Sequence, residues 1–327
     1  MKHVKCSLCG SPDEEFLYYV HDRNSPAKER FRLVRCVMCG LVFLNPRPVE
    51  SEISGYYPPW YHSRYMDNQW LESLTIQGIP WRDAMRGKGA NILKYKGSGR
   101  ILDVGCGDGI LLKFFQEQGF DVYGVESGDV SYAVKILGLN IHNGRLEDAN
   151  YQDGFFDVIS FYHVFEHLHD PFKTLLLVHS LLNNNGIVVI EVPNFAGFEA
   201  RIFRSSWVGI SAPLHLYHFT LKTLAELLTK AGFEILDKGS VPEKSRYIAG
   251  YSESLRFFLA DKGLYAHPWE QRKVDRNAKD EKQNLEKSVF SVKAALHRLE
   301  YLFFSVPAFL VHKLGMGSSI YCVARRR

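Results

Sequence analysis

The sequence predicts an α/β protein with a mainly parallel sheet, an N-terminal zinc-binding module and a helical insertion before the last strand. From Arg100 onward, apolar runs of strand length alternate with helix-like segments, which is typical of β-α-β crossovers. Four of the 6 cysteines form two Cys-x-x-Cys-Gly units near the N-terminus. A final strand-like run, SSIYCVAR, follows a long helix-like stretch.

Composition and charge narrow the functional classes. A chain of 327 residues with 46% hydrophobic residues can bury one sizeable core and carry appendages. The formal charge is only +4 and charges of both signs are interspersed, so we expect a small-molecule substrate and no nucleic acid. The segment MKHVKCSLCG lacks the apolar core of a signal peptide, and the longest apolar stretch, residues 301–311, is too short to span a membrane. We therefore expect a cytoplasmic protein.

The cysteine spacing predicts one structural zinc site in a module that covers residues 1–45. Cys6 and Cys9 form one Cys-x-x-Cys unit, and Cys36 and Cys39 form the other. Four thiolates around one tetrahedral zinc leave no open coordination position, so the metal would be structural. The alternative is two disulfides in a secreted protein, which the missing signal peptide disfavours. The two remaining cysteines are expected to be unpaired thiols.

Residues 46–95 are expected to form a connector followed by a helical segment. Prolines and aromatic residues crowd its first part, NPRPVESEISGYYPPWYHSRY. The aromatic side chains fit either a lid over a ligand or the packing of the zinc module onto its neighbour, and packing is favoured. They are Tyr56, Tyr57, Trp60 and Tyr61.

Residues 96–240 are expected to form the core, which begins with a strand, a glycine-rich turn and a helix in RILDVGCGDGILLKFFQEQGF. Three glycines alternate with other residues from Gly105 onward, and Ile110 stands where a dinucleotide fingerprint needs its third small residue. A pyrophosphate cradle is therefore disfavoured. The glycines still let a ligand approach the backbone, and Asp103 offers a carboxylate to a cationic or hydroxylated ligand.

Further acidic residues follow the next strands. The second strand, DVYGVE, ends in Glu126, where an acid would accept hydrogen bonds from ribose hydroxyls. Leu146, Glu147 and Asp148 fall on a turn after the third strand, and residues 156–163 are predicted to form a buried fourth strand. Because ligands of open α/β sheets bind at the carboxyl ends of the strands, these residues predict one site at that edge.

These residues resemble the class I S-adenosylmethionine-dependent methyltransferases, and specifically a bacterial small-molecule branch with an N-terminal zinc-ribbon module. The resemblance covers residues 100 to about 240 closely and rests on ILDVGCGDG, VES, LEDANYQDGFFDVIS, HVFEHLHDP, LLNNNGIVVIEVPN and HLYHFTLKTLAELLTKAGFEI. It implies a Rossmann-like, seven-stranded, mainly parallel sheet that binds S-adenosylmethionine.

The resemblance also implies a set of cofactor-binding residues. In this set, the glycine turn and the acid before it line the methionine part of the cofactor, and Glu126 holds the ribose hydroxyls. Leu146 and Glu147 flank the adenine, and His163 lies near the sulfonium. The whole set is Asp103, Gly105, Cys106, Gly107, Glu126, Ser127, Leu146, Glu147 and His163.

One motif permits a different interpretation, because FYHVFEHLHD contains the order H-x-x-E-H of a zinc peptidase. Such peptidases carry the motif on a helix, which places both histidines on one face. Here His163 is expected to close a strand, and Asp170 with Pro171 is expected to begin the next helix downstream of the motif. The structural setting therefore disfavours a peptidase.

Methyl transfer needs the acceptor to be held close, oriented and relieved of its proton, a task that suits histidine. The candidate catalytic residues are Glu166, His167 and His215, and for each a role as a hydrogen-bonded scaffold residue stays open. His218 is a weaker candidate. In some relatives of the resembling family a similar glutamate–histidine pair positions the acceptor or takes part in metal binding, and the sequence leaves that role undecided.

After a helix over residues 220–231, a sixth strand over 233–240 and a seventh over 318–327 are expected to close the sheet. Residues 241–317 are then an insertion, which we expect to act as a substrate lid or an interface element. Its apolar stripe at helical spacing fits a helix packed on its own domain, a homodimer seam, or peripheral membrane contact that receives a lipid-linked acceptor. The stripe is Leu285, Val289, Val292, Leu296, Leu299 and Phe303.

The sequence therefore predicts methyl transfer from S-adenosylmethionine to a small molecule, with a hydroxyl of a sugar, cell-envelope precursor or secondary metabolite as the acceptor. C-methylation of a sugar-type acceptor is the nearest alternative, because zinc-module relatives include such enzymes. A non-catalytic cofactor-binding module that acts through its zinc domain is the alternative from another class.

Overall fold

The computed structural model describes residues 1–23, 29–57, 74–76, 79–241, 244–264 and 314–327, with Leu71 and Val311, and it describes the side chains of the 244–264 segment from Tyr251 onward. Contacts divide the chain into two compact units. The first unit comprises Met1–Tyr56, Pro193–Thr220 and Gly239–Ile320, and the second comprises Tyr57–Val192, Leu221–Lys238 and Tyr321–Arg327. Residues 193–220, which the sequence grouped with the core, thus cluster with the N-terminal segment.

A seven-stranded sheet with the order β12-β13-β10-β9-β6-β7-β8 forms the centre of the second unit. The pairs β6–β7, β7–β8, β6–β9 and β9–β10 are parallel. The predicted Rossmann-like, mainly parallel sheet is confirmed. The strands are β6 (Gly99–Val104), β7 (Phe120–Glu126), β8 (Asn140–Asn143), β9 (Phe156–Tyr162), β10 (Leu182–Pro193), β12 (Phe233–Ser240) and β13 (Ser319–Arg326).

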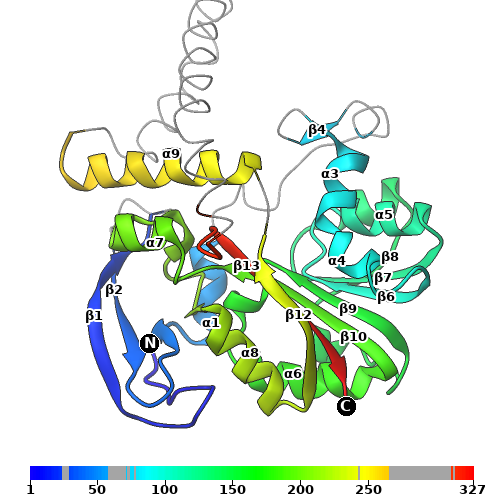
Figure 1. Cartoon of the computed structure of the whole chain (residues 1–327), viewed down its shortest axis with the longest axis horizontal. Helices are drawn as coiled ribbons and strands as arrows, with labels where there is room; N and C mark the ends of the chain where they lie inside the picture. The colour runs from blue at the N-terminus through cyan, green and yellow to red at the C-terminus, as the bar shows by residue number, and fades with distance from the viewer. Residues whose placement is uncertain are drawn as a thin grey trace, which may run out of the picture. The chain divides into compact units, whose positions relative to one another are not determined.

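Helices cover both faces of this sheet. Figure 1 shows α3, α4 and α5 on one side and α6 and α8 on the other. The helices are α3 (Trp81–Lys88), α4 (Ala90–Leu93), α5 (Ile110–Glu117), α6 (Pro171–Leu181) and α8 (Leu221–Lys230), with a π-helical segment η2 (Tyr132–Ile136) and 3-10 turns η3 (Leu146–Asp148) and η4 (Phe165–His167). A short hairpin, β4 (Thr75–Ile76) and β5 (Ile79–Pro80), precedes α3.

Local sequence explains where two of these helices begin. The Asp170 carboxylate accepts a hydrogen bond of 3.0 Å from the backbone N–H of Lys173, and Pro171 occupies the first turn of α6. The predicted start of α6 is therefore observed. Gly109 precedes α5 with a φ of 76°, a left-handed conformation that glycine adopts without steric cost.

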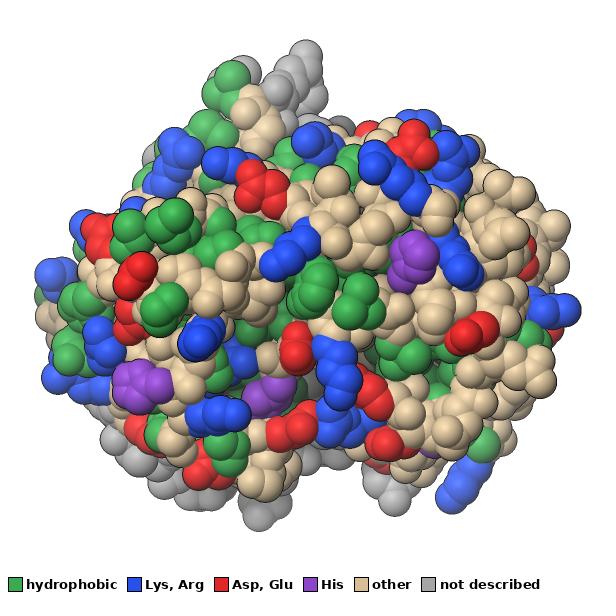
Figure 2. Space-filling model, turned by 90° about the horizontal axis from the view of Figure 1, so that it is seen from below, with side chains coloured by type: hydrophobic (Ala, Val, Ile, Leu, Met, Phe, Trp, Pro, Cys, Tyr) green, Lys and Arg blue, Asp and Glu red, His purple; other side chains and the backbone are tan. Residues whose placement is uncertain are grey.

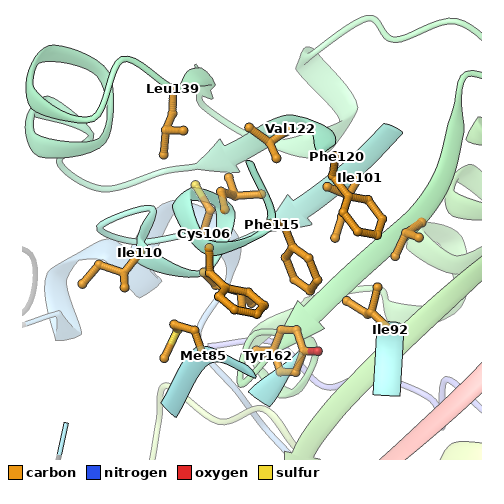
Figure 3. Packing of buried hydrophobic residues seen from close by; sticks show 14 of the residues in the cluster. Met85, Ile92, Ile101, Cys106, Ile110, Phe115, Phe120, Val122, Leu139 and Tyr162 are labelled. Atoms are coloured by element: carbon orange, nitrogen blue, oxygen red, sulfur yellow. The ribbon is translucent and has the colours of Figure 1, made fainter. Parts of the chain in front are cut away.

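The core of the second unit lies between the sheet and the helices α3 to α5. β9 is almost wholly buried along its length, as expected for a central parallel strand with both faces covered. Figure 3 shows Phe115 and Phe120 packed together and Tyr162 between Met85 and Ile92. These contacts fix the carboxyl end of β9 relative to α3.

The first unit contains an antiparallel sheet with the order β1-β2-β3-β11. Its strands are β1 (Glu14–His21), β2 (Arg30–Cys36), β3 (Val42–Leu44) and β11 (Tyr217–His218). Its helical segments are α1 (Glu50–Ile53), η1 (Ser54–Tyr56), α7 (Phe198–Phe203), η5 (Arg204–Ser206), η6 (Val208–Ile210) and α9 (Lys244–Asp261). Helix α9 belongs to the predicted insertion.

Some sequence predictions fall outside the described residues. They are the apolar stripe over residues 285–303 and the aromatic side chains Trp60 and Tyr61. Tyr56, which is described, packs edge-on against Phe31 at 5.9 Å between ring centroids and donates a hydrogen bond to Glu29. This contact agrees with the packing interpretation for that residue.

One face of the molecule shows the mixed charges that the sequence predicts. On the face drawn in Figure 2, basic and acidic side chains are interspersed. Within the described segments, none of the helices combines the length and the hydrophobicity that crossing a bilayer requires.

A buried carboxyl group joins α7 to α9 in the first unit. Glu199 is 2% exposed, and its Oε1 accepts a hydrogen bond of 2.6 Å from the Ser254 hydroxyl. The same hydroxyl accepts from the backbone N–H of Val208 at 3.0 Å. Burial raises the pKa of Glu199 to about 7, against the opposing effect of the hydrogen bonds from Ser254 and Trp207.

This raised pKa predicts a pH-dependent stability. Because the folded-state pKa exceeds the ordinary value of 4.5, the cost of ionising Glu199 is absent below pH 4.5 and complete above pH 7. Glu199→Gln should therefore raise the melting temperature at pH 8 and leave it nearly unchanged at pH 5, with a gain of up to about 3 kcal/mol. Glu226→Gln, at an exposed position of α8, is the control. An equal shift at both pH values would contradict the assignment.

Candidate cofactor and acceptor site

The glycine turn after β6 places backbone atoms without covering side chains at the carboxyl ends of the parallel strands. Gly105 and Gly107 have φ values of 71° and 55°, which glycine tolerates and most residues avoid. A Cβ added at Gly105 would lie 2.3 Å from the Val164 side chain, whereas a Cβ at Gly107 would meet nothing within 4 Å. The turn thus touches the end of β9 at one glycine and faces open space at the other.

Asp103 is a buried acid at the end of β6. Asp103 pairs with Ser160 of the neighbouring strand β9. Its Oδ1 accepts a hydrogen bond of 2.7 Å from the Ser160 hydroxyl. Burial raises the pKa of Asp103 to about 6, while the Lys88 ammonium and the Ser160 hydrogen bond oppose this rise and the charge of Glu126 adds to it. A cation bound beside Asp103 would lower the pKa again.

Glu126 links the ends of β6 and β7. Its Oε2 accepts a hydrogen bond of 3.0 Å from the backbone N–H of Gly107, and its Oε1 accepts one of 2.6 Å from that of Gly128. Each oxygen keeps acceptor capacity for a further hydroxyl. Ser127, the next residue, is exposed. Because both oxygens are held by backbone donors, the carboxylate has a fixed orientation beside the glycine turn.

Other residues of the predicted set differ in how they could contact a ligand. The Cys106 side chain is 8% exposed, and its sulfur lies 2.7 Å from the position of a Cβ added at Gly124. Burial raises the pKa of the Cys106 thiol, so the sulfur is a neutral packing group and only the backbone of Cys106 can face a ligand. Leu146 is buried, whereas Glu147 is exposed and lies 3.6 Å from Arg145.

His163 follows β9 in a left-handed conformation, with a φ of 59°. Its backbone N–H donates to the carbonyl of Glu191 at 2.9 Å. On its ring, Nε2 lies 3.1 Å from Oε1 of Glu191, and Nδ1 lies 3.6 Å from Oε1 of Glu166. The His163 side chain is 22% exposed, while the two carboxylates are 2% and 3% exposed. The imidazole is thus the accessible member of a group of otherwise buried side chains.

His167 contacts an aromatic residue of the predicted connector. The Tyr57 hydroxyl lies 3.2 Å from Nδ1 of His167, and the two rings stack at 6.4 Å between centroids. Both His167 and Glu166 belong to η4, a 3-10 turn of 3 residues. The H-x-x-E-H letters therefore fall on a strand end and a short turn, which excludes the single-helix setting of the peptidase motif.

The other candidate histidines belong to the first unit. Nδ1 of His215 lies 2.9 Å from the carbonyl of Gly209, and Nε2 of His218 lies 3.2 Å from the carbonyl of Ile210. Both carbonyls belong to η6. These hydrogen bonds hold each ring in place within its own unit, and the catalytic role predicted for His215 stays a prediction.

Sequence reasoning missed three residues at this edge. Glu191 lies two residues before the end of the buried strand β10, much as Glu126 ends β7, and an acid so close to a strand end could have been noticed in the sequence. Tyr162 ends β9, and burial together with the charges of Glu191 and Asp103 raises the pKa of its hydroxyl. Lys88 ends α3, and only the tertiary structure connects it to the site.

The four N-terminal cysteines come together in the first unit. Their sulfurs all lie within 4.8 Å of one another, with 3.4 Å between Cys6 and Cys39 and between Cys9 and Cys36. Four sulfurs at about 2.3 Å from one zinc would lie about 3.8 Å apart, so the cluster suits a single ion. The residues after the two pairs, Gly10 and Gly40, have φ values of 80° and 79° and close the expected tight turns.

Comparison with known proteins identifies the domain. Residues 82–238 match the protein family described as "Methyltransferase domain". Ubiquinone biosynthesis O-methyltransferase of Cereibacter sphaeroides is 30% identical over 152 residues, which are 42% of this chain and 62% of that protein. A probable S-adenosylmethionine-dependent methyltransferase of Mycolicibacterium smegmatis is 26% identical over 44% of this chain and 56% of its own length.

Among solved structures, a SAM-dependent methyltransferase from Archaeoglobus fulgidus has 18% identity and a TM-score of 0.46, covering 75% of this chain and 94% of that one. The matched segment spans only 52% to 62% of the first curated relatives. The family match covers the glycine turn, the strands β6 to β10 and most of β12, and it leaves out β13. Residues 82–238 of this chain therefore form a methyltransferase domain of the class I, S-adenosylmethionine-dependent kind.

Proposed function

We propose that this protein transfers a methyl group from S-adenosylmethionine to a small-molecule acceptor, with a hydroxyl of a sugar, cell-envelope precursor or secondary metabolite as the expected acceptor. The observation that carries the proposal is the open backbone at Gly107 between two oriented acids, Asp103 and Glu126. Several relatives are named O-methyltransferases, which supports an oxygen acceptor.

The residues at this edge fit the parts of the cofactor. Glu126, held by two backbone N–H groups, would accept hydrogen bonds from the ribose hydroxyls. Asp103 would pair with the ammonium of the methionine part, and Leu146 offers a buried apolar surface to the adenine. When bound, the cofactor supplies a methyl group that is attached to a positively charged sulfur.

The acceptor must lose its proton as its oxygen attacks the methyl group. His163 is partly exposed beside Val164, which touches the glycine turn, so it joins His167 and Glu166 as a candidate to receive that proton. Its contact with the buried Glu191 carboxylate would hold the ring in one orientation. The contact with Tyr57 in the same unit would orient the His167 ring.

Removing the Glu126 carboxylate should weaken cofactor binding. Glu126→Ala leaves the ribose hydroxyls without a charged acceptor, which should cost about 1–3 kcal/mol of binding free energy. The measurement is the Kd of S-adenosylhomocysteine by titration calorimetry. The control is Asp153→Ala, which removes an exposed acid at a turn of the same unit. An unchanged Kd in folded Glu126→Ala would refute the ribose assignment.

The raised pKa of Asp103 predicts how cofactor affinity depends on pH. Asp103 is ionised above about pH 6 in the free protein and would pair there with the ammonium of the ligand. Since protonation removes this pair, affinity for S-adenosylhomocysteine should fall as pH drops below 6, by up to about tenfold per pH unit. Asp103→Asn should bind more weakly at pH 8 and lose this pH dependence. A parallel pH profile in wild type and variant would contradict the assignment.

The proposal includes a structural zinc ion held by the cluster of four N-terminal cysteines. Four thiolates within 4.8 Å of one another are the donor set that zinc prefers, and they leave no position for a reacting water. The metal would therefore stabilise the N-terminal module and take no part in methyl transfer. A lipid-linked acceptor, a homodimer and a cytoplasmic location stay predictions of the sequence.

Metal analysis of purified variants tests this site. Wild-type protein should contain about one zinc per chain, and Cys36→Ser should lose it and melt at a lower temperature. Cys322→Ala, at a buried cysteine outside the cluster, should retain the metal. Full zinc retention in Cys36→Ser would show that the four thiolates do not form one site.

A further inference from the structure

A groove runs between helix α8 and strand β12 of the second unit. Its volume is about 710 Å³. Figure 1 shows the helix alongside the strand, and both contribute to the lining. The apolar part of the lining consists of Leu221, Ala225 and Ile235. Because Leu221 and Ile235 are only half-buried, the groove offers apolar surface to a binding partner.

Strand β12 forms one edge of the seven-stranded sheet. Among the strands that the structure describes, it is paired with β13 alone. Alternate N–H and C=O groups of an edge strand point away from the sheet, where they can pair with another extended chain. The strand, FEILDKGS, has 8 residues and contains no proline, whereas β8 at the opposite edge has only 4 residues. The longer unpaired edge therefore lies beside the groove.

The side chains around the groove carry an excess of positive charge. Three lysines line the groove together with one acid, Glu226. Lys222 lies 3.8 Å from the Glu226 carboxylate, so these two charges offset each other. The excess comes from the remaining lysines, Lys230 and Lys238, both of which are exposed.

The acids of β12 do not offset the charge of Lys238. Glu234 lies 2.6 Å from Arg325 of β13, and Asp237 lies 2.6 Å from Lys94. Within the described part of the chain, Lys238 forms no ion pair of its own. Its ammonium is therefore available to an acidic group of a partner.

The positive charge also discriminates between possible partners. Pairing of β12 with the same edge of a second copy would place two groups of lysines side by side, and this repulsion disfavours a homodimer at this edge. An acidic chain would meet complementary charge along the groove.

We propose that the groove between α8 and β12 binds an extended acidic segment of another protein. The segment adds a strand to the sheet beside β12, so that hydrogen bonds between the two main chains supply affinity. Its apolar side chains contact the floor of the groove, and its carboxylates face Lys230 and Lys238. The alternation of side chains along a strand allows both contacts at once.

A synthetic decapeptide that alternates glutamate and valine tests the inference. Labelled with fluorescein, it should bind the whole chain with a Kd of about 0.1 mM by fluorescence anisotropy. Hydrogen exchange followed by mass spectrometry should show slower exchange in residues 233–240 when the peptide is bound. Lys238→Glu should weaken binding about fivefold, because a like charge then faces the peptide. The same peptide with N-methyl groups on its two central residues, one for each edge, should not bind.

Lys135→Glu is the matched control, since it makes the same charge change at an exposed lysine of η2 and should leave the Kd unchanged. An equal loss in both variants, or binding of the N-methylated peptide, would mean that charge attraction acts without strand pairing. Self-association in sedimentation runs that Lys238→Glu abolishes would identify a second copy as the occupant. Binding to phosphatidylglycerol vesicles that Lys238→Glu abolishes would identify a membrane surface. Each of these results, and a wild-type Kd weaker than about 1 mM, overturns the inference.

Discussion

Asp103 is an acid buried at the carboxyl end of β6, and its burial is the constraint on which the arrangement of this edge depends. A carboxylate in that position favours its neutral form unless cations and hydrogen-bond donors offset the loss of water. Ser160 donates one hydrogen bond from the neighbouring strand, and Lys88 supplies positive charge from α3. The protein alone therefore compensates only part of the negative charge of Asp103. This favours a cationic ligand group beside the Asp103 carboxylate.

The same edge holds other acids in fixed orientations by different means. Glu126 is held by backbone N–H groups of two loops, whereas Glu191 faces His163. His163 pairs with this carboxylate while its backbone takes a left-handed conformation, a local strain that the hydrogen bond from its N–H to Glu191 helps to maintain. Acids that belong to different strands thus converge because parallel strands end at one edge.

Much of the fold and part of the candidate site could be predicted from the sequence. Physical reasons explain which predictions were possible and which were not. The strand ending at Glu126 and the helix beginning after Asp170 follow from local patterns, since apolar runs and capping residues act within a few positions. The inward direction of the Cys106 sulfur depends on the space left by Gly124 of the neighbouring strand, which no local pattern reports. Lys88 lay beyond prediction because its link to the site is a hydrogen bond from Tyr162, distant in the chain.

We infer that the turn after β6 and its acids form a site for S-adenosylmethionine. Titration calorimetry of the whole chain with S-adenosylmethionine and, separately, with NAD tests this site. We expect saturable binding of S-adenosylmethionine with one site per chain and no detectable binding of NAD, because Ile110 stands where a dinucleotide fingerprint needs a small residue. Binding of NAD alone, or of neither compound, would contradict this assignment.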